Sequence, residues 1–136
     1  MTDHKLPEAE LEVFACLSRL QEATARSIRE AMQSYRPMAH GSILTLLKRL
    51  EAKGWVSKRK GPVGKAFLYR PERELTPTLR DLVGNLVKRI FGGNSVALVA
   101  SLFETRPPTT EELAELRQLV ESLESQPDRL SSEGES

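Results

Sequence analysis

The sequence is poor in the residues that build metal centres and most catalytic sites. Its 136 residues include one cysteine, Cys16, and two isolated histidines, His4 and His40. A single thiol cannot form an intrachain disulfide or supply a cysteine-rich metal site. No Ser/His/Asp or Cys/His set is recognisable, and GPVGK (61–65) lacks the spacing of a phosphate-binding loop. We therefore expect that the protein is not an enzyme and that it binds no metal and no cofactor.

Long apolar runs are also missing. No stretch approaches the ~20 apolar residues of a membrane-spanning helix. The N-terminal segment MTDHKLPEAELE lacks the apolar core of a signal peptide. We expect a cytoplasmic protein with no direct membrane insertion and with a modest hydrophobic core.

Acidic residues are scarce between positions 36 and 73. This segment has ten Lys or Arg residues against Glu51 and Glu72, a net charge of +8, although the whole chain carries only +1. The compensating acids lie near the C-terminus, where residues 104–136 have nine acids against three arginines, a net charge of −6. One concentrated basic segment favours a local polyanion site. A solvated basic face would give the same pattern.

Helical periodicity predicts two helices before position 36. The first begins near Pro7, with Cys16 as a small packing residue beside its apolar stripe. The second begins at an N-cap, Thr24, and ends before SYRP (34–37). The residues expected to be buried are Val13, Phe14, Leu17, Leu20, Ile28 and Met32.

A third helix, expected within residues 39–55 (AHGSILTLLKRLEAKGW), has an apolar face and a basic face. Gly54 is expected to end it. Small residues let such a helix approach DNA closely, and Lys or Arg side chains reach phosphates or guanine edges. The expected buried face consists of Ile43, Leu46, Leu47 and Leu50. The opposite face and one flank carry Gly41, Ser42, Thr45, Lys48, Arg49 and Ala52.

The period then changes to that of β-strands. WVSKRK (55–60) and AFLYR (66–70) flank GPVGK, which predicts a β-hairpin with a basic tip. The second and third helices form a helix-turn-helix, and the hairpin is its wing. The predicted fold class is therefore mostly α with a small β-hairpin wing: a winged helix-turn-helix DNA-binding domain over residues 1–75. The expected DNA-binding residues are His40, Gly41, Ser42, Thr45, Lys48, Arg49, Lys58, Lys60 and Lys65.

The second half is predicted to be helical, with a dimerisation region over 76–125 and a disordered acidic tail over 126–136. GGN (92–94) and RPP (106–108) break the chain. SVALVASLF (95–103) is expected to be a buried helix, and Thr109 with Glu112 forms a capping-box pattern. The residues expected to join two subunits are Leu79, Leu82, Leu86, Ile90, Leu98, Leu102, Leu113, Leu116, Val120 and Leu123.

Three segments carry a resemblance to a known family: LPEAELEVFACL (6–17), RPMAHGSILTLLKRLEAKGWVSKRKG (36–61) and KAFLYRP (65–71). They resemble the penicillinase-repressor family of winged-helix transcriptional regulators (the BlaI/MecI/CopY group), over about residues 6–123. The resemblance implies a bacterial homodimeric repressor that binds double-stranded DNA at an inverted-repeat operator. It also implies that Ser42, Thr45 and Arg49 meet DNA, while Gly41 departs from the Ser, Thr or Lys usual at its position.

The resemblance further implies release of the repressor through a membrane-bound sensor protease in one branch of the family. The matching place here is Ser101-Leu102, which differs from the Asn-Phe bond cut in that branch. The paired cysteine motifs of the copper-responsive branch are absent from this sequence. Two other interpretations stay open: a winged-helix protein-interaction module, and a non-specific DNA-binding protein.

Overall fold

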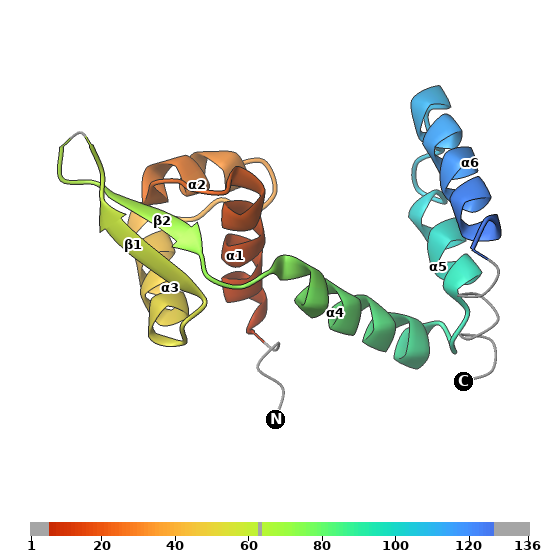
Figure 1. Cartoon of the computed structure of the whole chain (residues 1–136), viewed down its shortest axis with the longest axis horizontal. Coiled ribbons are helices and arrows are strands. Elements are labelled where there is room, and N and C mark those ends of the chain that lie inside the picture. Colours follow the sequence, from red (N-terminus) through yellow and green to blue (C-terminus); the bar gives the residue numbers. More distant parts are fainter. Residues whose placement is uncertain (1–5, 63, 127–136) are drawn as a thin grey trace. The chain divides into compact units, whose positions relative to one another are not determined.

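The computed structural model describes residues 6–62 and 64–126, and these residues contain six helices and one two-stranded hairpin (Figure 1). The chain divides into two compact units, with the boundary between Asn85 and Leu86. In chain order the elements are α1 (Glu8–Leu20), α2 (Ala25–Met32), α3 (His40–Ala52), β1 (Val56–Lys60), β2 (Phe67–Pro71), α4 (Leu75–Ile90), α5 (Ser95–Leu102) and α6 (Thr110–Glu124).

Helix α1 follows Pro7, as predicted, and carries Glu8 and Glu10 in its first turn, where acids suit the positive helix end. Its predicted apolar stripe is confirmed, except at one residue. Leu20 is 42% exposed, so the prediction that it is buried is wrong. Leu20 is the last residue of the helix, and Gln21 then leaves the helical conformation with a positive φ of 73°.

Helix α2 begins where its cap was predicted. The Thr24 side chain accepts a hydrogen bond from the Ser27 backbone N–H at 3.1 Å. The helix ends at Met32, before SYRP. Ile28 and Met32, which were predicted to be buried, are fully buried. A short helix of this kind is held mainly by packing, because eight residues form few internal hydrogen bonds.

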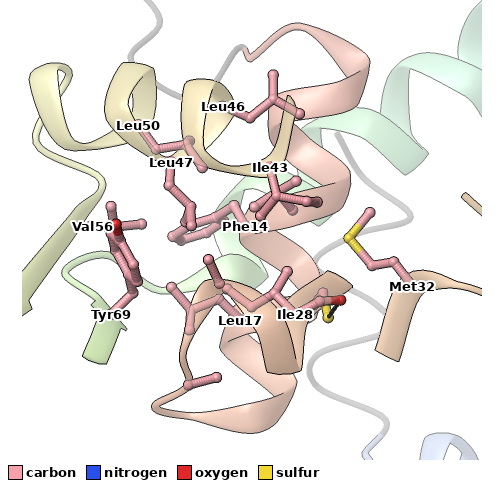
Figure 2. Close-up of a cluster of buried hydrophobic side chains, with 14 of the residues drawn as sticks. Phe14, Leu17, Ile28, Met32, Ile43, Leu46, Leu47, Leu50, Val56 and Tyr69 are labelled. Carbon is pink, nitrogen blue, oxygen red and sulfur yellow. Dashed lines mark hydrogen bonds between the residues drawn. The ribbon is translucent and has the colours of Figure 1, made fainter. Parts of the chain in front are cut away.

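Helix α3 buries the predicted face, and Gly54 follows its end with a φ of 81°, a conformation that glycine adopts without strain. The buried side chains of α1, α2 and α3 meet those of the hairpin in one core (Figure 2). At its centre the Phe14 and Trp55 rings pack edge to face, with centroids 5.1 Å apart.

The predicted hairpin is confirmed. Strands β1 and β2 pair antiparallel, from Val56 opposite Pro71 to Lys60 opposite Phe67. Two backbone hydrogen bonds between Ala23 and Tyr69, of 2.8 and 3.0 Å, join β2 to the loop before α2. The order of helix, helix, helix and hairpin is that of a winged helix, so the predicted class, mostly α with a small β-hairpin wing, is confirmed.

In the second unit, the predicted chain breaks and caps are present. Gly92 and Gly93 have positive φ values of 59° and 85°, and Asn94 caps α5 by accepting from the Ala97 N–H. The capping box of Thr109 and Glu112 is confirmed at the start of α6. Among the helices of 6–62 and 64–126, none combines the length and hydropathy of a membrane span.

The prediction that residues 95–103 form a buried helix is half wrong. The helix forms, but no residue of α5 is buried within the single chain. Val96 is 77% exposed and Leu102 is 59% exposed. Helix α6 buries none of its residues either, so its apolar side chains do not cover α5 within the single chain. The apolar faces of α4, α5 and α6 remain open to solvent.

Candidate nucleic-acid interface

The face of α3 opposite the core is exposed along its whole length. Gly41, Ser42, Thr45, Lys48 and Arg49 all lie on the solvent side, as the helical period predicted. A Cβ built at Gly41 would meet no other atom within 4 Å, so the space beside this position is open. The first residue of α3 is His40, which is also exposed.

The Thr45 hydroxyl is already used within the helix. Its Oγ1 donates a hydrogen bond to the Gly41 carbonyl oxygen at 3.0 Å. The hydroxyl therefore has no proton left to donate to a ligand, whereas its methyl group is free to make apolar contacts. This geometry suits contact with an apolar group, such as a thymine methyl, better than donation to a base acceptor.

Two cations on this face are available for a ligand. Within the described segments, neither the Lys48 nor the Arg49 side chain has a hydrogen bond or an ion pair. The acid nearest in sequence on α3, Glu51, lies 3.7 Å from the Lys58 Nζ on β1 instead. An unpaired guanidinium can bind a guanine edge or a phosphate in the bidentate manner that arginine favours.

The predicted basic wing divides into two parts. Near the body of the domain, Lys58 pairs with Glu51, and its Nζ lies 4.6 Å from the centre of the Phe67 ring. Arg59 makes two hydrogen bonds to Glu22, at 3.1 and 3.2 Å. These pairs attach the wing to α3 and to the loop before α2. Neither pairing follows a spacing along one helix or strand, and the Arg59–Glu22 pair spans 37 positions, so the sequence pattern does not indicate the two acid partners.

The outer part of the wing keeps its cations exposed. Lys60 ends β1 and Lys65 lies in the turn, and among the described residues neither has an ion-pair partner. Of the three wing lysines predicted to bind DNA, these two are free, and the third also holds the wing in place.

A cleft of about 340 Å³ lies between the first turns of α2 and α3 on one side and the wing on the other. Its walls include Arg26 and Leu44, which sequence analysis did not single out, together with His40 and Lys65, which it did. Arg26 lies outside the basic segment 36–73, and charge counting therefore could not find it. Leu44 stands out only as a large apolar residue left exposed on the flank of α3.

The base of α3 is fixed to the rest of the domain. Lys53, just after the helix, contacts Glu10 of α1 at 2.5 Å, and Glu10 is only 3% exposed. Before the helix, Arg29 donates to the Met38 carbonyl oxygen at 3.0 Å. These contacts hold both ends of α3, which gives its exposed face a defined position on the domain.

Two ionisable side chains of the core, Cys16 and Tyr69, are held neutral. Burial raises the pKa of the Cys16 thiol, and the nearby Arg19 and Tyr35 only partly oppose this. The thiol therefore stays protonated at neutral pH, as expected for a packing residue. Burial and the Glu51 carboxylate both raise the pKa of Tyr69, so the wall of the cleft gains no negative charge from its phenol.

This chain is similar to proteins of a known family. The model of the penicillinase repressor family matches residues 6–122. The methicillin resistance regulatory protein MecI of Mammaliicoccus sciuri is 26% identical over 117 residues, which cover 86% of this chain and 94% of that protein. The MecI protein of Staphylococcus aureus strain N315 matches with the same identity and coverage.

Two solved structures share the fold. One is a cysteine-to-serine mutant of MarR from E. coli complexed with operator DNA, with a TM-score of 0.52 and 19% identity over 88% of this chain and 76% of that one. The other is a mutant of ZitR from Lactococcus lactis, with a TM-score of 0.51 and 15% identity over 90% of this chain and 75% of that one. At these identities the likeness concerns the fold alone. The family match extends from α1 through most of α6, and the chain therefore belongs to the penicillinase repressor family.

Proposed function

We propose that this chain is a transcriptional repressor that binds a specific DNA operator as a homodimer. The observation that carries the proposal is the exposed face of α3, which combines an unobstructed glycine, a free methyl group and two unpaired cations. Such a face fits the major groove, which admits a helix and displays a different pattern for each base pair. Family membership and the names of the relatives as regulatory proteins support a regulatory role rather than a catalytic one.

In this proposal the side chains of α3 divide their roles by position. Thr45 reads a base edge, and Arg49 bonds either to a guanine edge or to a phosphate. Ser42, in the first turn, donates to a phosphate near the positive end of the helix. Lys48, together with Lys60 and Lys65 of the wing, contacts the backbone, which sets the register without reading sequence.

The second copy of the chain is proposed to cover the open apolar faces of the second half. Large apolar residues along α4, α5 and α6 are exposed in the single chain, which is unusual for a soluble monomer. A closed dimer would bury the same surface on both subunits. The proposed contact residues are Leu79, Leu82, Leu86, Ile90, Leu98, Leu102, Leu113, Leu116, Val120 and Leu123, all within the region 76–125.

Release of the repressor through a sensor protease is proposed to act at the end of α5. Ser101 and Leu102 form the last two residues of α5, and both are exposed in the single chain. Cleavage between them would separate α6 from the rest of the subunit and would weaken the proposed dimer. The proposed acidic tail, 126–136, lies outside the described residues except for Gln126.

The test is an in vitro selection of the purified protein on random-sequence duplexes. Enrichment of an inverted repeat would support sequence-specific binding by a symmetric dimer. Binding without enrichment, with a steep dependence on salt, would support a non-specific DNA-binding protein instead. No binding to any duplex, with the protein folded, would favour a protein-interaction module and would overturn the proposal.

A further inference from the structure

The cleft between the start of α3 and the wing collects basic side chains from three separate elements. Arg26 comes from the first turn of α2, His40 from the first residue of α3, and Lys65 from the turn of the wing. None of the described residues that line the cleft is acidic. A concave surface with charge of one sign concentrates ligands of the opposite sign, so the cleft favours an anion.

The remaining wall of the cleft is apolar. Leu44, Ala66 and Phe67 contribute to it, and both Leu44 and Phe67 are large side chains left partly exposed. A small inorganic anion would leave this wall in contact with water. A ligand that joins an anionic group to an apolar body would cover both parts, and a deoxyribose with its phosphate has that composition.

We propose that the cleft is a phosphodiester subsite, which holds one phosphate and its adjoining deoxyribose from the DNA strand that borders the groove read by α3. This inference rests on the proposed function and adds Arg26 to the interface. The Arg26 Nε lies 3.2 Å from a Glu30 carboxylate oxygen, in a pair with both side chains largely exposed. Exposed pairs of this kind contribute little, and the guanidinium can turn from Glu30 to a phosphate at small cost.

The walls of the subsite are fixed before any ligand binds. The backbone bonds between Ala23 and Tyr69 hold β2 against the start of α2. Lys58 of β1 also lies 3.7 Å from Glu51 of α3, an accessible pair that adds only a little to this arrangement. A preformed site loses little conformational entropy on binding, so even one phosphate contact contributes usefully to affinity.

The first test is the salt dependence of DNA binding by Arg26→Gln. Its control is Arg89→Gln, which removes the same charge from an exposed residue of α4, outside the cleft. Loss of one phosphate contact per subunit should reduce the slope of log affinity against log salt by about 0.9 for each subunit. The affinity should fall by a similar factor on a selected duplex and on a scrambled one, because a phosphate contact carries no sequence information.

The second test locates the phosphate. Each backbone phosphate of the selected duplex is replaced in turn by an uncharged methylphosphonate, and binding is measured for the wild type, Arg26→Gln and Lys65→Gln. We expect one position in each half-site at which the methylphosphonate weakens binding by either variant less than it weakens wild-type binding. That pattern identifies the phosphate that both side chains contact.

The two proposals fail in different ways. Absence of duplex binding by the wild-type protein would remove the proposed function itself. Wild-type binding combined with an unchanged salt slope in Arg26→Gln, or with additive methylphosphonate effects at every position, would remove only the subsite. Thermal melting of Arg26→Gln checks folding, and little change is expected because the side chain is exposed.

Discussion

Thr45 offers a sharp test of base reading, because its two γ substituents have different surroundings. The hydroxyl donates to the Gly41 carbonyl, whereas the methyl group is free on the exposed face of α3. We therefore predict that the methyl group makes the contact with DNA. Thr45→Val keeps that methyl group and removes the hydroxyl, and Thr45→Ser does the reverse.

The expected magnitudes follow from the area that each change removes. Loss of one buried methyl group costs about 0.8 kcal/mol, which is roughly fourfold in affinity at each half-site and about fifteenfold for a symmetric dimer. Thr45→Ser should show this loss, whereas Thr45→Val should bind within about twofold of the wild type. The free energy of unfolding of both variants should lie within about 0.5 kcal/mol of the wild-type value, because the residue is exposed and lies away from the core.

The assay is fluorescence anisotropy with the selected duplex at fixed salt, repeated with uracil in place of each thymine. Uracil removes the methyl group from the DNA side of the contact. At the thymine that Thr45 contacts, replacement by uracil should lower the affinity of the wild type. The same replacement should cause no further loss of affinity in Thr45→Ser. Wild-type affinity in both variants would show that Thr45 reads no base. Loss of affinity only in Thr45→Val would show that the hydroxyl oxygen makes the contact.

Three further predictions concern other parts of the chain. Arg49→Ala should weaken operator binding by about 1–3 kcal/mol and relax the preference at one base pair, as measured by titration against single-base variants. Leu116→Asp or Leu123→Asp should yield monomers in sedimentation velocity, and unchanged dimers in both would place the subunit contact elsewhere. Arg106 lowers the pKa of Glu112 to about 2 from its ordinary value of 4.5. The contribution of this pair to stability should therefore be complete above about pH 4.5 and should be lost as the pH falls towards 2, a loss that Glu112→Gln should abolish in acid melts.

The local features of the fold could be predicted from the sequence because they depend on residues close together in the chain. The N-cap at Thr24, the helix end at Gly54 and the capping box at Glu112 each follow from the chemistry of one turn. Helical spacing also separated the buried face of α3 from its exposed face, since that distinction needs only the period of the helix.

The failures arise where the outcome depends on distant residues. Leu20 has the correct spacing for burial, but the chain turns at Gln21 and no neighbour covers it. Helix α5 has the apolar composition of a buried helix, yet its own chain supplies too little surface to cover it. The pairing of Arg59 with Glu22, 37 positions away, depends on how the hairpin packs, which no local pattern records.

This pairing changes what the basic segment can offer to DNA. Residues 36–73 contain ten Lys or Arg residues, and counting charges treats all of them as available. Six of them already contact partners inside the protein, five with carboxylates and one with the face of the Trp55 ring. These six are Arg36, Lys53, Lys58, Arg59, Arg70 and Arg73. The cations of the segment that have no such partner among the described residues are Lys48, Arg49, Lys60 and Lys65.

The salt dependence of operator binding should show whether all ten cations of residues 36–73 contact DNA or only the four without an internal partner. Four free cations per subunit, with Arg26 as a fifth if the cleft holds a phosphate, allow eight to ten phosphate contacts in a dimer. Each contact contributes about 0.9 to the slope of log affinity against log salt, which predicts a slope between about −7 and −9. If all ten cations of each subunit met phosphates, the slope would approach roughly −18 by the same rule. A measured slope well beyond −9 would show that the internal ion pairs break when DNA binds, and that the wing does not keep the position it has in the free protein.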